Sequence, residues 1–349
     1  MGERVRQTLT VLIGHLPGLG LLLVLGVPAL VLQAHLTVSG KPVVSAVALV
    51  MVFGLVLRNL AGMPTSCLRG TRFAVTRLLR IGIVLLGAQL SLGEVLRSGG
   101  QSLLLIATCI ILAILVVHRL SVWMGLSERL ATLIGVGTSI CGVSAVVATA
   151  PVIQAKEEET ALAVGTIAAF GLLALFVYPL LGTALGLSDH VFGIWAGVAV
   201  NDTSQVVATG LMYSQHAAEI ATVVKLTRNL FMAPVILVLN AAYMRRAASG
   251  GSGFASGGNR TYRNIVPVFV LGFLGMAVLN SLGILGLQAR HLLRSLSGFL
   301  ILLGIGGVGL GTDLAAVRRI GLKPFYAGLC AAVFMAAVSY TLIALVGIE

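Results

Sequence analysis

Long apolar segments recur along the whole chain and are separated by short polar or glycine-containing connections. A helix needs about 20 mainly apolar residues to cross the hydrocarbon core of a bilayer. The pattern indicates about eleven such spans, over residues 19–37, 43–60, 73–92, 101–118, 129–153, 159–182, 190–212, 217–243, 265–283, 295–312 and 324–347. We therefore expect an all-α polytopic membrane protein, folded as a single transmembrane domain over residues 1–349.

Composition and charge agree with a membrane protein. Of the 349 residues, 58% are hydrophobic and 10% are charged, whereas soluble domains carry about 25% charged residues. The net charge of +12 does not require nucleic acid, because most Lys and Arg residues fall in alternate connections, on the side of the N-terminus. This positive-inside bias predicts a cytoplasmic N-terminus. Nucleic acid is therefore excluded as a partner.

One connection reads as a true linker, and two internal resemblances suggest repeats. Residues 245–264 are basic and rich in Gly and Ser, which predicts a flexible cytoplasmic loop. Residues 79–92 resemble residues 301–314 in a span of opposite direction, as in inverted-repeat transporters. Residues 144–150 also resemble residues 204–210, in spans expected to be parallel. The two resemblances compete, so the register of the repeat stays open.

Five consecutive polar residues interrupt the apolar span 190–212. They include Asp202, and an acid near the bilayer centre costs about 2.5–3.5 kcal/mol on insertion scales. Such a group is tolerated when it faces a protein interior or a water-filled cavity, which favours a role in coupling to H+ or a cation. The alternative is a structural acid neutralised by a basic neighbour. The predicted ion-coupling residues are Asn201, Asp202, Thr203, Ser204 and Gln205.

Glycines and hydroxyl residues are concentrated in the span 129–153. Three glycines within residues 135–142 weaken a helix, and a broken helix exposes backbone N–H groups that attract anions. The alternative is close helix packing, which small residues also support. The neighbouring hydroxyl and thiol groups favour a pocket, with predicted substrate-binding residues Gly137, Thr138, Ser139, Cys141, Gly142 and Ser144.

Two cations lie on one stripe of the span 217–243. Lys225, Arg228 and Asn229 share helical spacing and are predicted to bind an anionic substrate. Pairing of a cation with Asp202, or snorkelling toward the membrane surface, are the alternatives. The glycines of residues 304–311 indicate either tight packing or a second discontinuous helix, and Asp313 is expected to cap the segment that follows.

Motifs of soluble enzymes are absent from the sequence. There is no P-loop, dinucleotide fingerprint or HExxH motif, and the four cysteines lack metal-ligand spacing. We therefore expect no enzyme activity, no catalytic residue, no metal site and no cofactor.

Three stretches resemble the YeiH family of bacterial inner-membrane proteins, whose name assigns sulfate export. They are GTSICGVSAVVATAPVIQAKEEE (137–159), LGLSDHVFGIWAGVAVNDTSQVVATG (185–210) and VKLTRNLFMAP (224–234). The family is grouped with bile-acid and arsenite carriers. The resemblance implies inverted repeats, a core domain with crossing discontinuous helices, and a panel domain.

Together these observations predict a secondary active transporter that exports a small anion such as sulfate, sulfite or an organosulfonate, coupled through Asp202. The expected partners are that inorganic or organic anion, H+ or Na+ as coupling ion, membrane lipid and, as an open alternative, a second copy in a homodimer. A cation/proton antiporter that uses Asn201 and Asp202 is the main rival. A membrane sensor or scaffold without transport is the third hypothesis.

Overall fold

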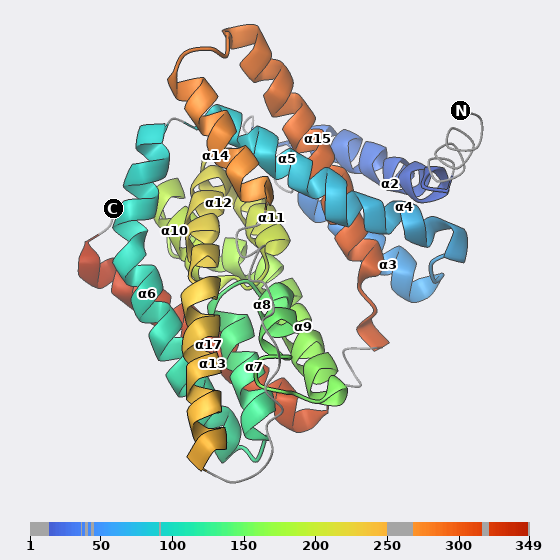
Figure 1. The fold of residues 1–349 in the computed structure, drawn as a ribbon. Helices are drawn as coiled ribbons and strands as arrows, with labels where there is room; N and C mark the ends of the chain where they lie inside the picture. The colour runs from blue at the N-terminus through green and yellow to red at the C-terminus, as the bar shows by residue number, and fades with distance from the viewer. Residues whose placement is uncertain are drawn as a thin grey trace, which may run out of the picture. The chain divides into compact units, whose positions relative to one another are not determined.

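The computed structural model describes residues 14–35, 37–38, 41–42, 45–90, 92–249, 268–315 and 321–347. These residues are almost entirely helical, which confirms the all-α class (Figure 1). A two-residue antiparallel ribbon, β1 (Thr37–Val38) and β2 (Lys41–Pro42), is the exception among them. The chain divides into two compact units: unit 1 comprises residues 1–95, 211–215 and 269–316, and unit 2 comprises the remainder.

Unit 1 is built around one long helix, α15 (Leu287–Gly311), shown in orange in Figure 1. This helix packs against α2, α3 and α5. The other elements of the unit are α2 (Leu16–His35), α3 (Ala46–Leu60), η1 (Thr65–Cys67), α4 (Leu68–Phe73), η2 (Ala74–Leu78), α5 (Leu79–Leu86), η3 (Gly87–Gln89) and nearly all of α14 (Val268–Ser281).

The glycines of α15 serve close packing. A Cβ atom on Gly304 would lie 2.6 Å from the Cβ of Leu79, and one on Gly309 would collide with the carbonyl oxygen of Met51. From α3, a Cβ on Gly54 would lie 2.8 Å from the Gly306 carbonyl oxygen. Because α15 is continuous to Gly311, the prediction of a discontinuous helix in this span is wrong. The alternative, tight packing, is confirmed.

The two segments predicted to be repeats are neighbours in unit 1. Helix α5 packs against α15, and the Ser297 hydroxyl donates a hydrogen bond of 2.7 Å to the Gly82 carbonyl. Both Gly82 and Gly304 face the opposite helix, since a Cβ on Gly82 would lie 2.7 Å from the Ile301 side chain. This contact does not test a common origin, and the inverted repeat stays a prediction.

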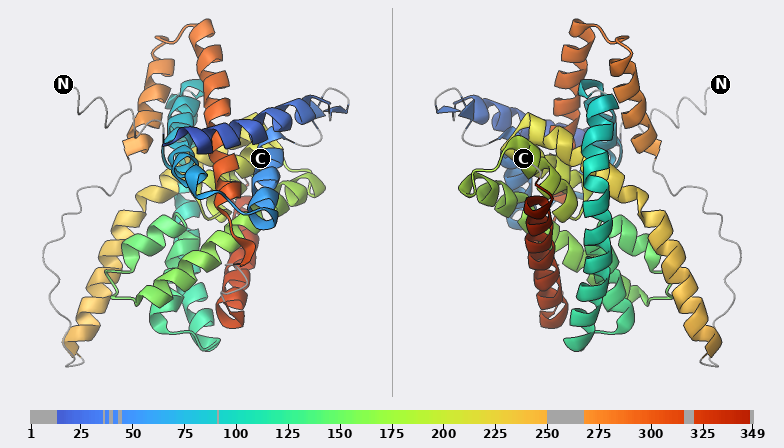
Figure 2. Two further views of the ribbon diagram at one scale, coloured as in Figure 1. Left: turned by 90° about the vertical axis from the view of Figure 1, so that its right-hand side faces the viewer. Right: turned by 90° about the vertical axis from the view of Figure 1, so that its left-hand side faces the viewer.

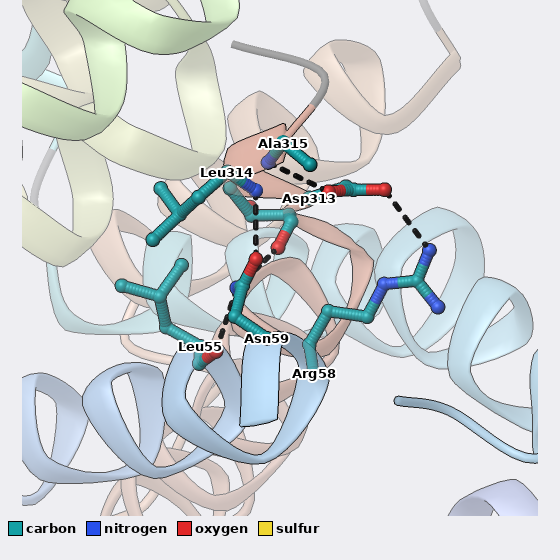
Figure 3. Close-up of polar contacts among 7 residues, drawn as sticks. Leu55, Arg58, Asn59, Asp313, Leu314 and Ala315 are labelled. Carbon is teal, nitrogen blue, oxygen red and sulfur yellow. Dashed lines mark hydrogen bonds and ion pairs between the residues drawn. The ribbon is translucent and has the colours of Figure 1, made fainter. Parts of the chain in front are cut away.

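The ends of α3 and α15 are joined by polar contacts (Figure 3). The Asn59 amide donates to the Thr312 carbonyl over 3.1 Å and accepts from the Leu314 N–H over 2.8 Å. The Asp313 carboxylate accepts from the Ala315 N–H over 2.8 Å and lies 3.6 Å from the Arg58 guanidinium. The expectation that Asp313 caps the following segment is confirmed.

Unit 2 combines long uninterrupted helices with shorter ones. The long helices α6 (Leu92–Trp123), α9 (Glu157–Ala184) and α17 (Leu322–Val346) are visible in Figure 2 in teal, yellow-green and red. The shorter ones are α7 (Glu128–Ser139), α8 (Val143–Thr149), α10 (Asp189–Ala199), α11 (Thr203–Tyr213), α12 (Gln215–Leu230) and α13 (Met232–Ser249). Helix α7 packs against α9 and α17, with Leu133, Ile134 and Ile167 in the shared apolar core.

The expected loop over residues 245–264 begins later than predicted. Helix α13 continues to Ser249, because Arg and Ala residues over 245–248 are good helix formers. The prediction is therefore wrong for these first residues. Residues 250–264 lie outside the described part of the chain.

Six helical segments in the described ranges are long and apolar enough to cross a membrane, and one of them, Gln215–Arg245, runs over α12 and α13. Helices α3 and α14 are shorter apolar helices, and the windows 129–153 and 190–212 are each divided between two helices. Within the described residues, each predicted window nevertheless consists mainly of helical residues. The count of eleven spans, the cytoplasmic N-terminus and the single transmembrane domain stay predictions.

Candidate functional site

The predicted break in the span 129–153 is present between α7 and α8. Helix α7 is capped at its start by Ser127, which accepts a hydrogen bond from the Leu130 N–H. It ends at Ser139, and the chain turns at Gly142, whose φ of 69° and ψ of −130° are accessible almost only to glycine. The two halves are therefore separate helices within one apolar segment.

A second break divides the span 190–212 between α10 and α11. Val200 is extended, and Asp202 caps the new helix: one carboxylate oxygen, Oδ1, accepts from the Ser204 N–H over 2.8 Å and also from the Ser204 hydroxyl. In return, the Gln205 side-chain oxygen accepts from the Asp202 N–H over 3.3 Å. These bonds resemble a capping box, with the carboxylate on the second N–H of the helix rather than the third, and they explain why a helix begins at Thr203.

The two breaks lie against each other. A Cβ atom on Gly142 would lie 3.3 Å from the Asn201 carbonyl oxygen and 3.5 Å from the Asp202 Cα. Gly142 is thus required both for its backbone conformation and for this close approach. All these residues belong to unit 2.

Lys225 of α12 holds the C-terminal ends of both interrupted helices. Its side chain has no solvent exposure, and its ammonium donates to the carbonyls of Ile140 (2.8 Å), Val200 (2.9 Å) and Asn201 (2.5 Å). A Lys ammonium has three N–H donors. All three are therefore used on backbone carbonyls.

Arg228, one helical turn further along α12, contacts the same two ends. It is also without solvent exposure. Its Nε donates to the Ser139 carbonyl over 2.6 Å, one terminal nitrogen donates to the Val200 carbonyl over 2.9 Å, and the other donates to the Thr138 carbonyl. Since a guanidinium has five N–H donors, two donors have no bond within the described residues.

These cations are stabilised by dipoles rather than by an acid. The last carbonyls of a helix carry a partial negative charge equivalent to roughly half an electron, and α7 and α10 both end here. Within the described ranges, no carboxylate lies at ion-pair distance from Lys225 or Arg228. Direct pairing with Asp202 is therefore absent, and the full burial of both cations rules out snorkelling.

Asn229 extends the polar contacts to the start of α11. This residue is 6% exposed, and its amide nitrogen lies 3.4 Å from the Thr203 hydroxyl. Its carbonyl oxygen has no partner, nor does the hydroxyl of Thr138, which is 1% exposed. A buried polar group without a partner costs about 1–3 kcal/mol, so this cluster is incomplete without a further ligand or water.

The predicted residues divide into those in this network and those beside it. Bonds or direct contact join Thr138, Ser139, Gly142, Asn201, Asp202, Thr203, Ser204, Gln205, Lys225, Arg228 and Asn229. Ser139 contributes its carbonyl, because its hydroxyl bonds to Val136 in its own helix. The Cys141 thiol lies 3.7 Å from the Met232 sulfur, Gly137 packs against Val146 and Ile167, and Ser144 is exposed.

Sequence reasoning missed the carbonyls of Ile140 and Val200. Both are apolar residues, and their contribution is made entirely by the backbone. The signal that could have found them is the pair of buried cations on α12, because buried cations need acceptors. A count of the acidic side chains in these spans would have shown that there are too few to pair with both cations.

The fold and site thus define a helical membrane protein in which two interrupted helices meet at a buried Lys/Arg pair. The family model described as "Conserved hypothetical protein 698" matches residues 17–328, so the chain belongs to this family, the YeiH family expected from the motifs.

Curated relatives match over most of the chain. A "UPF0324 membrane protein" of Bacillus cereus is 33% identical over 96% of both chains. One of Streptococcus agalactiae is 34% identical over 95% of this chain and 98% of its own. One of Streptococcus pyogenes is 37% identical over 88% and 90%. No solved structure matches the chain significantly.

Proposed function

We propose that this membrane protein is a secondary active transporter for a small anion. The observation that carries the proposal is the pair of fully buried cations, Lys225 and Arg228, at the meeting point of two interrupted helices. Ionisable residues inside membrane segments mark substrate or ion pathways by default. Interrupted helices at mid-span are likewise the usual binding element of secondary transporters.

The charge at this point favours an anion over a cation. Lys225 and Arg228 supply two positive charges, and the C-terminal ends of α7 and α10 offset roughly one. The starts of α8 and α11 add roughly half a charge each at most, against one negative charge on Asp202. The sum lies between about zero and one positive charge, which favours an anion over a cation.

The donors suit an oxyanion. Arg228 retains two N–H donors after its three backbone bonds, and a guanidinium binds oxyanions through parallel hydrogen bonds. The Thr138 hydroxyl is a further group that can donate and has no partner within the described residues. Sulfate, sulfite and organosulfonates present the required oxygens. Lys225, whose donors are all used, positions the two breaks.

Asp202 is the coupling residue in this proposal, supported by Asn201, Thr203, Ser204 and Gln205. It lies in the break itself and is the acid nearest to the buried cations along the interrupted segment. The rival cation/proton antiporter would use the same carboxylate, with the cation and the proton competing for it.

Transport by the full chain in liposomes tests the proposal. Solid-supported membrane currents and internal pH changes are recorded on adding sulfate, sulfite, taurine, Na+ or Li+. We expect responses to at least one of the anions, a strongly raised KM in Arg228→Lys, and unchanged responses in Arg119→Lys, whose side chain is exposed. Responses to cations alone would overturn the proposal in favour of the antiporter.

A further inference from the structure

We infer, on the basis of the proposed transport function, that the anion and a proton bind to this carrier together. In its ionised form, Asp202 occupies the donors at the start of α11. When Asp202 is protonated, the substrate anion takes them. The coupling is therefore symport, and H+ is the coupling ion.

The start of α11 already holds an anion that the chain itself provides. The Asp202 carboxylate accepts both the backbone N–H and the hydroxyl of Ser204 through the same oxygen. Helix α11 has 11 residues, so its first turn offers oriented N–H groups of the kind that bind anions at helix N-termini in other proteins. A protonated carboxyl is a weak acceptor, so protonation releases both Ser204 donors.

Thr138 shows independently that this site lacks a ligand. Its hydroxyl, which can donate to an anion, is 1% exposed and has no partner among the described residues, and its carbonyl accepts a hydrogen bond from Arg228. The adjacent Arg228 has two further N–H donors that make no bond within the described residues. Arg228 of α12 and Ser204 of α11 thus place donors at the two ends of the short Val200–Asp202 connection.

Electrostatics gives the same sign of coupling. In the described part of the chain, the charge of Asp202 acts on two titratable groups, Lys225 of α12 and the Cys141 thiol of the α7–α8 connection. Lys225 also binds the carbonyl of Asn201, directly before Asp202. Protonation of Asp202 removes the negative charge that opposes the buried ammonium of Lys225. The attraction for an anion therefore rises.

Linkage makes this effect reciprocal. If the proton raises the affinity for the anion by a given factor, the anion raises the affinity for the proton by the same factor. Coupling between binding sites is commonly about 5- to 150-fold. A cation substrate gives the opposite sign, because it competes with the proton for the carboxylate.

Proton counting on the purified full chain tests the inference. Sulfate and methanesulfonate are titrated into the protein at neutral pH by calorimetry in two buffers of different ionisation enthalpy. Neither probe changes its own protonation there. We expect up to one proton taken up per anion bound, and an affinity that rises at least about fivefold as the pH falls.

Variants identify the group that takes the proton. Asp202→Asn should bind the anion with no proton uptake and with the affinity that the wild type reaches at low pH. Asp189→Asn, which changes an acid at the start of α10, should behave as the wild type. The sign measured on the wild type decides whether the coupling is symport even if Asp202→Asn does not fold.

The failures of the two proposals are distinguishable. Anion binding without proton uptake, or with proton release, overturns the symport inference and leaves the anion carrier standing. Proton uptake that persists in Asp202→Asn also overturns the inference, because another group then takes the proton. Release of protons on adding Na+ or Li+, with no binding of either anion, overturns both.

Discussion

Helices α15 and α7 are both rich in glycine, yet only α7 is interrupted. Gly304, Gly306 and Gly309 of α15 face the backbones and side chains of α3 and α5, and the helix runs unbroken. Helix α7 does not continue through Gly142, because the backbone of this residue is not helical. The carbonyls released at this break are bound by Lys225 and Arg228. Glycine content therefore does not mark a break. A buried donor that receives the freed carbonyls does.

Removal of the Lys225 ammonium should have the largest effect of the changes considered. Lys225→Met fills a similar volume but leaves the carbonyls of Ile140 and Asn201 without a donor, and the Val200 carbonyl with Arg228 alone. Breaking a buried charged contact costs about 3–5 kcal/mol, so we expect a large loss of folded protein in detergent, measured as thermal stability by fluorescence-detected chromatography. Lys156→Met, at an exposed position, is the control and should change stability by less than about 0.5 kcal/mol. Equal stabilities would show that the breaks do not depend on Lys225.

Substitutions at two glycines of α15 distinguish the effect of close packing from the effect of helix propensity. A Cβ on Gly309 would collide with the Met51 carbonyl, whereas one on Gly298 meets nothing within 4 Å. Gly309→Ala should destabilise unit 1 by about 1–3 kcal/mol, because the tight contact with α3 must open. Gly298→Ala should be neutral or stabilising by up to about 1 kcal/mol. Chemical unfolding of both variants in the same detergent measures the difference, and a stable Gly309→Ala would contradict the close-packing account.

The turn at Gly142 should be sensitive for a different reason. Gly142→Ala places a side chain at a φ of 69° and 3.3 Å from the Asn201 carbonyl, which costs about 1–3 kcal/mol. The strain is local to the two breaks, so anion binding should weaken before the protein unfolds. Binding isotherms and thermal stability of the same preparation are compared. Normal binding by a destabilised variant would show that the contact between the breaks is not needed for the site.

The sequence predicted the helical class, the break near Gly142 and the family, because each depends on residue type or motif. The span 295–312 was predicted as a candidate for the second break, whereas the second break lies at Val200 and Asn201. Glycine is compatible with both outcomes, so composition alone could not decide between them.

The candidate site was predictable in its residues and not in its contacts. Lys225, Arg228 and Asp202 were recognised because charged residues are rare in apolar spans. Their partners are mainly backbone carbonyls, to which any residue type can contribute. Whether Lys225 binds substrate or backbone therefore depends on the fold, and the three short N–H···O contacts favour the backbone.

The smallest effect is expected at the polar contacts between the ends of α3 and α15, which are the exposed counterpart of the Lys225 contacts. Arg58 and Asp313 lie 3.6 Å apart with side chains 28% and 43% exposed, and exposed pairs contribute about 0.2–1 kcal/mol. Arg58→Met should therefore destabilise unit 1 by less than about 1 kcal/mol, and by less still at high salt, because the charges are screened. Thermal unfolding at low and high salt measures this. A loss as large as that of Lys225→Met would contradict the view that burial, rather than charge, sets the difference between the two helix ends.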